Sequence, residues 1–259
     1  MTTPYSYYDL PMGYLHSNGH KDPTRFLVGM ELEIESLTEI KLPSNSPIQV
    51  VEDHSLRNGG REFLIPPSTP EKAMDYFKQI HGKWITYRKD AFSERTSIHI
   101  HVNCMMMEEE TIRGFLYLYS IFEPVFFNYA GESRKYNIHC VPLGMTSMPS
   151  IYKQQLWDIL CTWHKYTAFN MLPLKTLGTI EFRHLSGTND VSYVAYWLRM
   201  INTLWMAAKQ LESTSMALDL FFLKGVELDL LTPEYFSLTK DKNEFVLEQN
   251  LIDVKLAFI

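Results

Sequence analysis

The chain has 259 residues, 46% of them hydrophobic and 14% aromatic, which excludes a disordered protein and allows a large buried core. Its 24 basic and 30 acidic side chains give a formal net charge of -6, which argues against a broad nucleic-acid-binding surface. No apolar run approaches the ~20 residues that span a bilayer, and the first residues do not form a secretion signal. We therefore expect a cytoplasmic protein without a membrane partner.

The chain contains no internal repeat, low-complexity tract or long linker, so it predicts a single domain over residues 1–259. Residues 1–25 lack a clear period and are expected to form an irregular arm that packs on the body through its aromatic side chains. Residues 213–259 are expected to form a C-terminal extension of short helices. The three cysteines include no Cys-x-x-Cys pair, which argues against disulfides and a thiolate zinc site. Nothing in the sequence indicates an oligomeric state.

The first half of the chain predicts three strands and a helix. Residues 26–35 alternate strictly between apolar and other side chains, which is typical of a half-buried strand. Extended segments at 49–56 and 61–65 flank an Asn-Gly-Gly turn signal and predict a hairpin that ends at Pro66 and Pro67. A helix is expected from Pro70 to Gly82.

The second half predicts a strand at 96–103 and then a long aromatic helix with a kink at Pro124. Helices over 149–170 and 190–212 are expected to flank a strand at 178–186. Strands interspersed irregularly with helices favour an α+β fold with a mixed or antiparallel sheet. We expect helices packed on this sheet.

Three glutamates share the polar face of the first strand: Glu31, Glu33 and Glu35. Alternate residues of a strand lie about 6.6 to 6.8 Å apart, so like charges would line one side of this strand. One interpretation is a solvated outer face. The other is a divalent cation that removes the repulsion and binds carboxylate oxygens, and the low strand propensity of glutamate favours it.

Three other strands carry similar polar residues, each with two readings. His99 and His101 share one strand face, either as ordinary surface histidines or as ligands of a metal and a neighbouring phosphate. Glu181 and Arg183 share another face, either as an exposed ion pair or as a cation ligand beside a phosphate-binding guanidinium. Glu62 and Asp53, on either side of the predicted hairpin, would complete a bowl of carboxylates.

An oxygen-rich ligand set favours Mg²⁺, or Mn²⁺ in its place, over zinc, and indicates phosphoryl chemistry. Nucleases, phosphatases and ATP-dependent ligases all fit this set. The P-loop, the dinucleotide-binding glycine motif and the Gly-x-Ser-x-Gly elbow do not occur, and no Ser-His or Cys-His arrangement is evident in the sequence.

The order of these motifs resembles the amidoligases of the carboxylate-amine ligase superfamily, which includes glutamine synthetase and glutamate-cysteine ligase. The resemblance covers about residues 26–190. The matching segments are Gly29-Met30-Glu31-Leu32-Glu33, Asp53-His54-Ser55-Leu56, Glu62 with the residues up to Pro67, Ser97-Ile98-His99-Ile100-His101-Val102, Lys165-Tyr166 with Asn170, and Gly178-Thr179-Ile180-Glu181-Phe182-Arg183. No single segment is diagnostic, but their order and spacing together are fairly specific.

The resemblance implies a glutamine-synthetase-like sheet whose concave face binds ATP and Mg²⁺. The implied metal ligands are Glu31, Glu33, Asp53, Glu62, His99 and Glu181. The implied catalytic residues are Arg183, Glu181 and Glu62. The implied nucleotide or phosphate contacts are His101, Arg183, Lys165, Tyr166, Asn170 and Arg134.

The implied reaction joins a small-molecule or peptide carboxylate to an amine through an acyl phosphate, and residues 135–150 are a candidate lid over that intermediate. The alternatives are a metal-dependent phosphoesterase or nuclease, and a non-catalytic nucleotide-binding protein of the same fold. Two positions depart from the family pattern. His54 replaces a glycine and would be strained if its φ were positive, and Ser97-Ile98 lacks a glycine that commonly precedes the first histidine.

Overall fold

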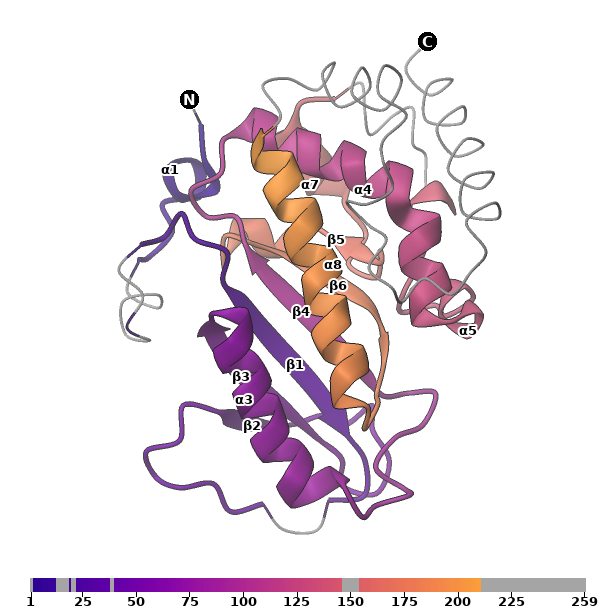
Figure 1. Ribbon diagram of the computed structural model, residues 1–259. Coiled ribbons are helices and arrows are strands. Elements are labelled where there is room, and N and C mark those ends of the chain that lie inside the picture. Colours follow the sequence, from indigo (N-terminus) through magenta and orange to yellow (C-terminus); the bar gives the residue numbers. More distant parts are fainter. Residues whose placement is uncertain (1, 13–18, 20–21, 38–39, 146–153, 211–259) are drawn as a thin grey trace.

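The computed structural model describes residues 2–12, 19, 22–37, 40–145 and 154–210 (Figure 1). Within these residues the strands form one six-stranded sheet of order β2-β3-β1-β4-β6-β5, and all its neighbouring pairs are antiparallel. The strands are β1 (Val28–Ile34), β2 (Gln49–Glu52), β3 (Arg61–Ser68), β4 (Ser97–Asn103), β5 (Phe169–Asn170) and β6 (Thr179–Ser186). The prediction of an α+β fold with an antiparallel sheet is therefore confirmed.

Helices cover one face of the sheet. Those described are α1 (Pro4–Tyr8), α3 (Pro70–Ile80), α4 (Glu109–Ala130), α5 (Glu132–Lys135), α7 (Leu156–Thr162) and α8 (Val191–Gln210). Figure 1 shows α3 and α8 lying in front of the strands, and α3 contacts β1 and β3 while α4 contacts α8 and β6. None of the described helices is long and apolar enough to cross a membrane.

The apolar side of each central strand forms the core beneath these helices. Alternate residues of β1 from Val28 to Ile34 are almost fully buried, as the strand periodicity predicts. Ile100 on β4 and Phe182 on β6 are paired in register and equally buried. Burial on this face fixes the register, because a shift by one residue would turn these side chains to the other side. The polar residues of the same strands are thereby held on the opposite face.

The predicted hairpin is present, but β3 is longer than predicted. It continues through Pro66 and Pro67 to Ser68, so the expectation that the prolines end the strand is wrong. Proline lacks the backbone N–H of a sheet ladder. Here β2 pairs only with residues 61–64, and the pairing of β1 with β3 shifts register between Val28 and Met30, opposite the prolines. The strand can therefore pass through them without a missing donor.

The helix predicted over 149–170 is wrong in the described residues. Only α7 is helical there, and Trp163 at its end has an extended backbone. The chain then turns and adds β5 to β6, while the backbone N–H of Ala168 donates to the carbonyl of Val141 at 2.8 Å. Sheet pairing has overridden an apolar pattern that would equally fit a helix. The other predicted helices begin close to their expected residues, although α3 ends at Ile80 and continues as a π-helical turn, His81–Ile85.

The N-terminal arm is partly helical, contrary to the prediction of an irregular segment. Thr3 and Ser6 form a reciprocal capping box that starts α1. Tyr7 stacks on Trp157 with ring centroids 4.6 Å apart, so the arm does pack on the body through an aromatic side chain, as predicted. Residues 13–18, 20–21 and the predicted helical extension over 213–259 lie outside the described residues.

Candidate functional site

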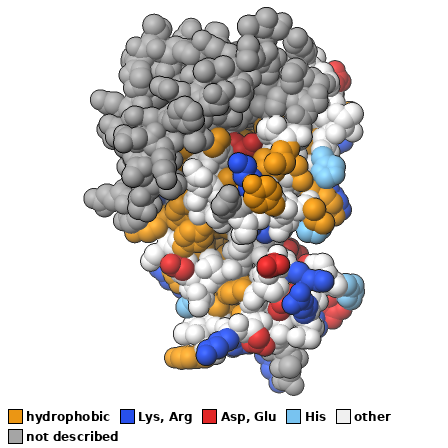
Figure 2. All heavy atoms as spheres, turned by 90° about the vertical axis from the view of Figure 1, so that its right-hand side faces the viewer, with side chains coloured by type: hydrophobic (Ala, Val, Ile, Leu, Met, Phe, Trp, Pro, Cys, Tyr) orange, Lys and Arg blue, Asp and Glu red, His pale blue; other side chains and the backbone are white. Residues whose placement is uncertain are grey.

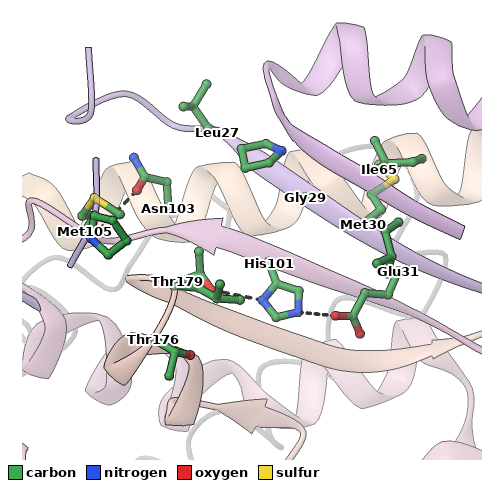
Figure 3. Close-up of a pocket in the computed structure, with 14 residues that line it drawn as sticks. Leu27, Gly29, Met30, Glu31, Ile65, His101, Asn103, Met105, Thr176 and Thr179 are labelled. Carbon is green, nitrogen blue, oxygen red and sulfur yellow. Dashed lines mark hydrogen bonds and ion pairs between the residues drawn. The ribbon is translucent and has the colours of Figure 1, made fainter. Parts of the chain in front are cut away.

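The face opposite the helices carries the polar residues of β1, β4 and β6. Glu31 on β1 lies opposite His99 on β4 and contacts both histidines of that strand. Its Oε2 is 3.1 Å from His99 Nδ1, and its Oε1 is 3.0 Å from His101 Nε2. Figure 3 shows the His101 ring held between Glu31 and Thr179, whose Oγ1 is 3.0 Å from His101 Nδ1. One carboxylate thus links two neighbouring strands.

These contacts shift the pKa values of the pair. Burial alone would raise the pKa of Glu31, but the hydrogen bonds with His101 and His99 outweigh it and hold that pKa well below its ordinary value. Burial alone would lower the pKa of His101, but its hydrogen bond to Glu31 and the charge of that carboxylate raise it. The pair therefore favours an ionised carboxylate beside a protonated imidazole.

Glu181 extends the cluster onto β6. It lies opposite His101 in the strand pairing, and its Oε1 is 3.2 Å from His99 Nδ1. Asn170 on β5 donates to Glu181 Oε2 at 2.7 Å, and the Arg183 guanidinium forms an ion pair with Oε1. The Glu181 side chain is only 5% exposed. Its ion pair with Arg183 is therefore not the solvent-exposed pair that was one of the two interpretations of the sequence.

Three of these residues could hold a metal ion. One ligand atom each from Glu31, His101 and Glu181 lies within 4.8 Å of the others. Two carboxylates and an imidazole suit Mg²⁺ or Mn²⁺, and the crowded acidic groups nearby would gain from a cation. The sequence assigned His99 to a metal and His101 to a phosphate. In the described geometry His101 belongs to this group. His99 contacts the carboxylates of Glu31 and Glu181 through Nδ1, and its Nε2 contacts Ser97 Oγ.

A second acidic group lies further along β1. Glu33 pairs with Glu62 on β3, so both carboxylates face the same side of the sheet. Burial and the surrounding negative charge raise the pKa of Glu62 to about 8. The carboxylates responsible are Glu31, Glu33 and Asp53. The predicted carboxylates therefore come together, with the exception of Glu35, which is buried and accepts from the backbone N–H of Arg57.

The turn that carries Asp53 does not need a glycine at position 54. Asp53 Oδ1 accepts from the backbone N–H of Ser55 at 2.8 Å, and its carbonyl accepts from Leu56. The positive φ angles of this connection fall instead at Asn58 and Gly59, residue types that tolerate them. The departure from the family pattern at His54 therefore causes no strain.

Ser97 takes a role that the sequence did not reveal. Its Oγ is 2.8 Å from His99 Nε2 and donates to Glu33 Oε2 at 2.8 Å, and its backbone N–H donates to the same oxygen. The structure therefore contains a Ser-His hydrogen bond that the sequence analysis did not identify. Because the hydroxyl proton is donated to Glu33, the oxygen accepts from His99 and is not activated as a nucleophile. A His at i+2 on the same strand face was the available signal.

Of the remaining predicted contacts, Lys165 and Tyr166 follow the end of α7 at Thr162, and Arg134 lies in α5. Lys165 is exposed, and its Nζ lies 4.6 Å from the centroid of the Tyr166 ring, which the Arg183 guanidinium also approaches. Arg134 is 4% exposed and donates to the backbone carbonyls of His184 and Arg183 at 2.6 and 2.8 Å. In this arrangement Arg134 holds β6, while its role as a nucleotide contact stays a prediction.

Part of the predicted lid is hydrogen-bonded to a buried carboxylate, Glu123, which the sequence analysis did not identify. Glu123 on α4 accepts from the backbone N–H groups of Leu143 and Gly144 at 2.6 and 2.8 Å, and from the hydroxyl of Tyr119. Burial raises its pKa. The backbone carbonyl of His139 in the same segment accepts from Arg183 Nε at 3.1 Å, which connects this segment to the site. Residues 146–150 of the predicted lid lie outside the described residues.

An apolar cavity of about 470 Å³ adjoins the cluster (Figure 3). Glu31 and His101 line it, together with Gly29 near the start of β1. Its other walls are mainly aliphatic side chains. They include Pro11, Leu27, Leu64, Pro67, Met105 and Leu177.

The comparisons do not assign the chain to a family. No protein-family model matches it, and no curated protein matches it in sequence. On the described part of the face shown in Figure 2, acidic, basic and histidine side chains are interspersed, so the described side chains there form no broad basic patch of the kind that binds nucleic acid.

Proposed function

We propose that this protein is an ATP- and Mg²⁺-dependent carboxylate-amine ligase with a glutamine-synthetase-like fold. The observation that carries the proposal is the convergence of Glu31, His101 and Glu181 within 4.8 Å on one sheet face, with Arg183 paired to Glu181. A cation site beside a guanidinium suits the charge that develops on a transferred phosphoryl group. The motif order in the sequence adds to this support.

In this proposal, the substrate carboxylate attacks the γ-phosphorus of ATP, the bond to the bridging oxygen breaks, and ADP leaves. An amine then attacks the acyl carbon, phosphate leaves, and the amine loses a proton as the amide forms. Bound Mg²⁺ supplies charge neutralisation for the phosphates. Arg183 faces the phosphoryl group, and Asn170 and His99 hold Glu181 in place through their contacts at 2.7 and 3.2 Å.

The described site favours a ligase over an enzyme with a protein nucleophile. Ser97 Oγ donates its proton to Glu33, and the other described hydroxyl at the cluster, Thr179 Oγ1, is hydrogen-bonded to His101 Nδ1 at 3.0 Å. A phosphoryl transfer between two substrates needs positioning and charge stabilisation, but no covalent enzyme intermediate. A metal-dependent phosphoesterase would use the same acidic face, so experiment must separate the two.

Thermal shift with Mg²⁺ alone and with Mg²⁺ and ATP tests the site. We expect stabilisation by both, and its loss in Glu181→Gln for Mg²⁺ and in Arg183→Ala for ATP. The matched control is Glu94→Gln, which removes one negative charge from an exposed loop residue. Unchanged stabilisation in Glu181→Gln would place the cation elsewhere.

Turnover identifies the reaction. ADP release that requires both a carboxylate and an amine supports the ligase. Phosphodiester cleavage without ATP would instead identify a phosphoesterase or nuclease, and nucleotide binding without turnover for any substrate pair would identify a binding protein.

A further inference from the structure

The apolar cavity beside the acidic cluster has the size and the lining of a ligand site. Its volume of about 470 Å³ is roughly three times that of a 150 Å³ protein cavity that holds benzene. It shares Glu31 and His101 with the candidate cation group. A molecule whose charged head lies at that group would therefore place its remainder in this cavity.

The chemistry of the lining selects an uncharged, aliphatic occupant. None of the described lining residues is Lys or Arg, so a second anionic group on the ligand would find no counter-charge there. None is Phe, Tyr or Trp, which would be the usual platform for a nucleobase. An acyl chain needs neither.

The polar side chains in the lining are largely occupied by the protein itself. Asn103 Nδ2 donates to the carbonyls of Pro23 and Arg25, and its Oδ1 accepts from the backbone N–H of Met105. Thr179 Oγ1 contacts His101 Nδ1 at 3.0 Å. Few groups therefore remain to read the hydrogen-bonding edge of a base or of a polar amino acid.

We infer that this cavity binds the hydrocarbon chain of the carboxylate substrate, so that the substrate class is aliphatic monocarboxylic acids of medium length. The inference rests on the proposed ligase function for the position of the carboxylate, and it adds the specificity of that site. Gly29 lines the cavity and has no side chain to fill it. A Cβ at this position would meet the carbonyl of Ile65 at 3.4 Å and His101 Cβ at 3.8 Å, which are ordinary contacts, so a longer side chain would extend into the cavity.

Calorimetric titration of the protein in MgCl₂ with butanoate, hexanoate and octanoate tests the inference directly, without nucleotide. We expect the affinity to rise roughly fourfold for each added methylene, which corresponds to about 0.8 kcal/mol. Gly29→Leu should weaken octanoate binding at least tenfold. The control Gly82→Leu adds the same side chain where a Cβ meets no atom within 4 Å, and it should leave binding unchanged.

A second variant tests the cavity independently, in case Gly29→Leu does not fold. Leu64 lines the cavity and is only partly buried, so Leu64→Ala should fold and should shift the preference toward acids longer than octanoate. An affinity that does not depend on chain length would overturn the inference. Loss of adenosine binding rather than octanoate binding in Gly29→Leu would assign the cavity to a base and would overturn it as well.

ADP release, measured with the same acids and an amine, separates this inference from the proposed function. Binding that depends on chain length, without ADP release, supports the cavity assignment and rejects the ligase. ADP release with polar acids alone, without dependence on chain length, supports the ligase and rejects the cavity assignment.

Discussion

Glu62 on β3 lies directly opposite Glu33 on β1, and both carboxylates face the acidic side of the sheet. Like charges at opposed positions of an antiparallel pair destabilise a sheet. The protein reduces this repulsion by keeping Glu62 largely protonated near neutral pH, because burial and its acidic neighbours raise its pKa to about 8. The same crowding makes this end of the site receptive to a cation.

Replacement of Glu62 by Gln should remove part of the pH dependence of stability. The folded-state pKa of about 8 exceeds the ordinary value of 4.5, so the neutral form stabilises the fold below that ordinary value, and this stability is lost as the pH rises through 8. Glu62 is partly exposed, and after allowance for solvent screening we expect a loss of about 1–2 kcal/mol. Thermal melts from pH 5 to 9 without Mg²⁺ should therefore show a fall in Tm that is roughly 2–8 °C smaller in Glu62→Gln.

The exposed loop residue Glu94 provides the control for this change. Glu94→Gln removes the same formal charge, yet it should follow the wild-type pH profile. Parallel profiles for wild type and Glu62→Gln would show that Glu62 is ionised in the folded protein throughout this range.

Binding of Mg²⁺ near pH 7 should release protons from both Glu62 and His101. A carboxyl with a pKa of about 8 is mostly protonated at pH 7 and must ionise to act as a ligand. Calorimetry in buffers of different protonation enthalpy measures the number of protons released. Near pH 7 the number should be lower by close to one in Glu62→Gln, where His101 alone still loses a proton. Proton release that is unchanged by this substitution would exclude Glu62 from the cation site.

The sequence predicts the strands that carry the site better than the segments around them. Alternation identifies β1, β4 and β6 because one face of each strand is fully apolar, as for Ile100 and Phe182. The same alternation places Glu31, His101 and Glu181 on the other face. Their convergence follows from the strand order, in which β1, β4 and β6 are neighbours, and periodicity alone does not give that order.

The features that the sequence predicted wrongly, or did not predict, are those that depend on tertiary contacts. The apolar pattern around β5 fits a helix, and only its pairing with β6 makes this segment extended. Glu123 has no local signal, because it is a lone glutamate in an aromatic helix, and the sole local signal for Ser97 is the histidine two residues further along the strand. Each becomes informative only when its partners, such as His99 or the backbone of Leu143, are brought beside it.

The two arginines near β6 should respond differently to substitution. Arg134→Met removes a buried donor from the carbonyls of Arg183 and His184, and we expect a loss of about 2–4 kcal/mol in the free energy of unfolding. Arg183→Lys keeps a charge beside Glu181 but loses the planar fork. Its stability should change little, while kcat for ADP release should fall at least tenfold.

Denaturant unfolding and steady-state kinetics on both variants check this contrast. A large loss of stability in Arg183→Lys together with normal kcat would reverse the two assignments. Binding of Mg²⁺ should survive in both variants, because neither arginine is a ligand.

Ser97→Ala should lower stability more than it lowers turnover. The substitution removes a hydroxyl that joins His99 Nε2 to Glu33, and Glu33 keeps only the backbone N–H at 2.7 Å. Loss of one buried partner costs about 1–2 kcal/mol, or roughly 2–8 °C in Tm. Ser97→Thr retains a hydroxyl and should restore part of this loss. If Ser97 were a nucleophile, turnover would vanish in both variants and a fluorophosphonate would label the wild-type serine. We expect no labelling, because the hydroxyl proton is committed to Glu33 and the oxygen accepts from His99.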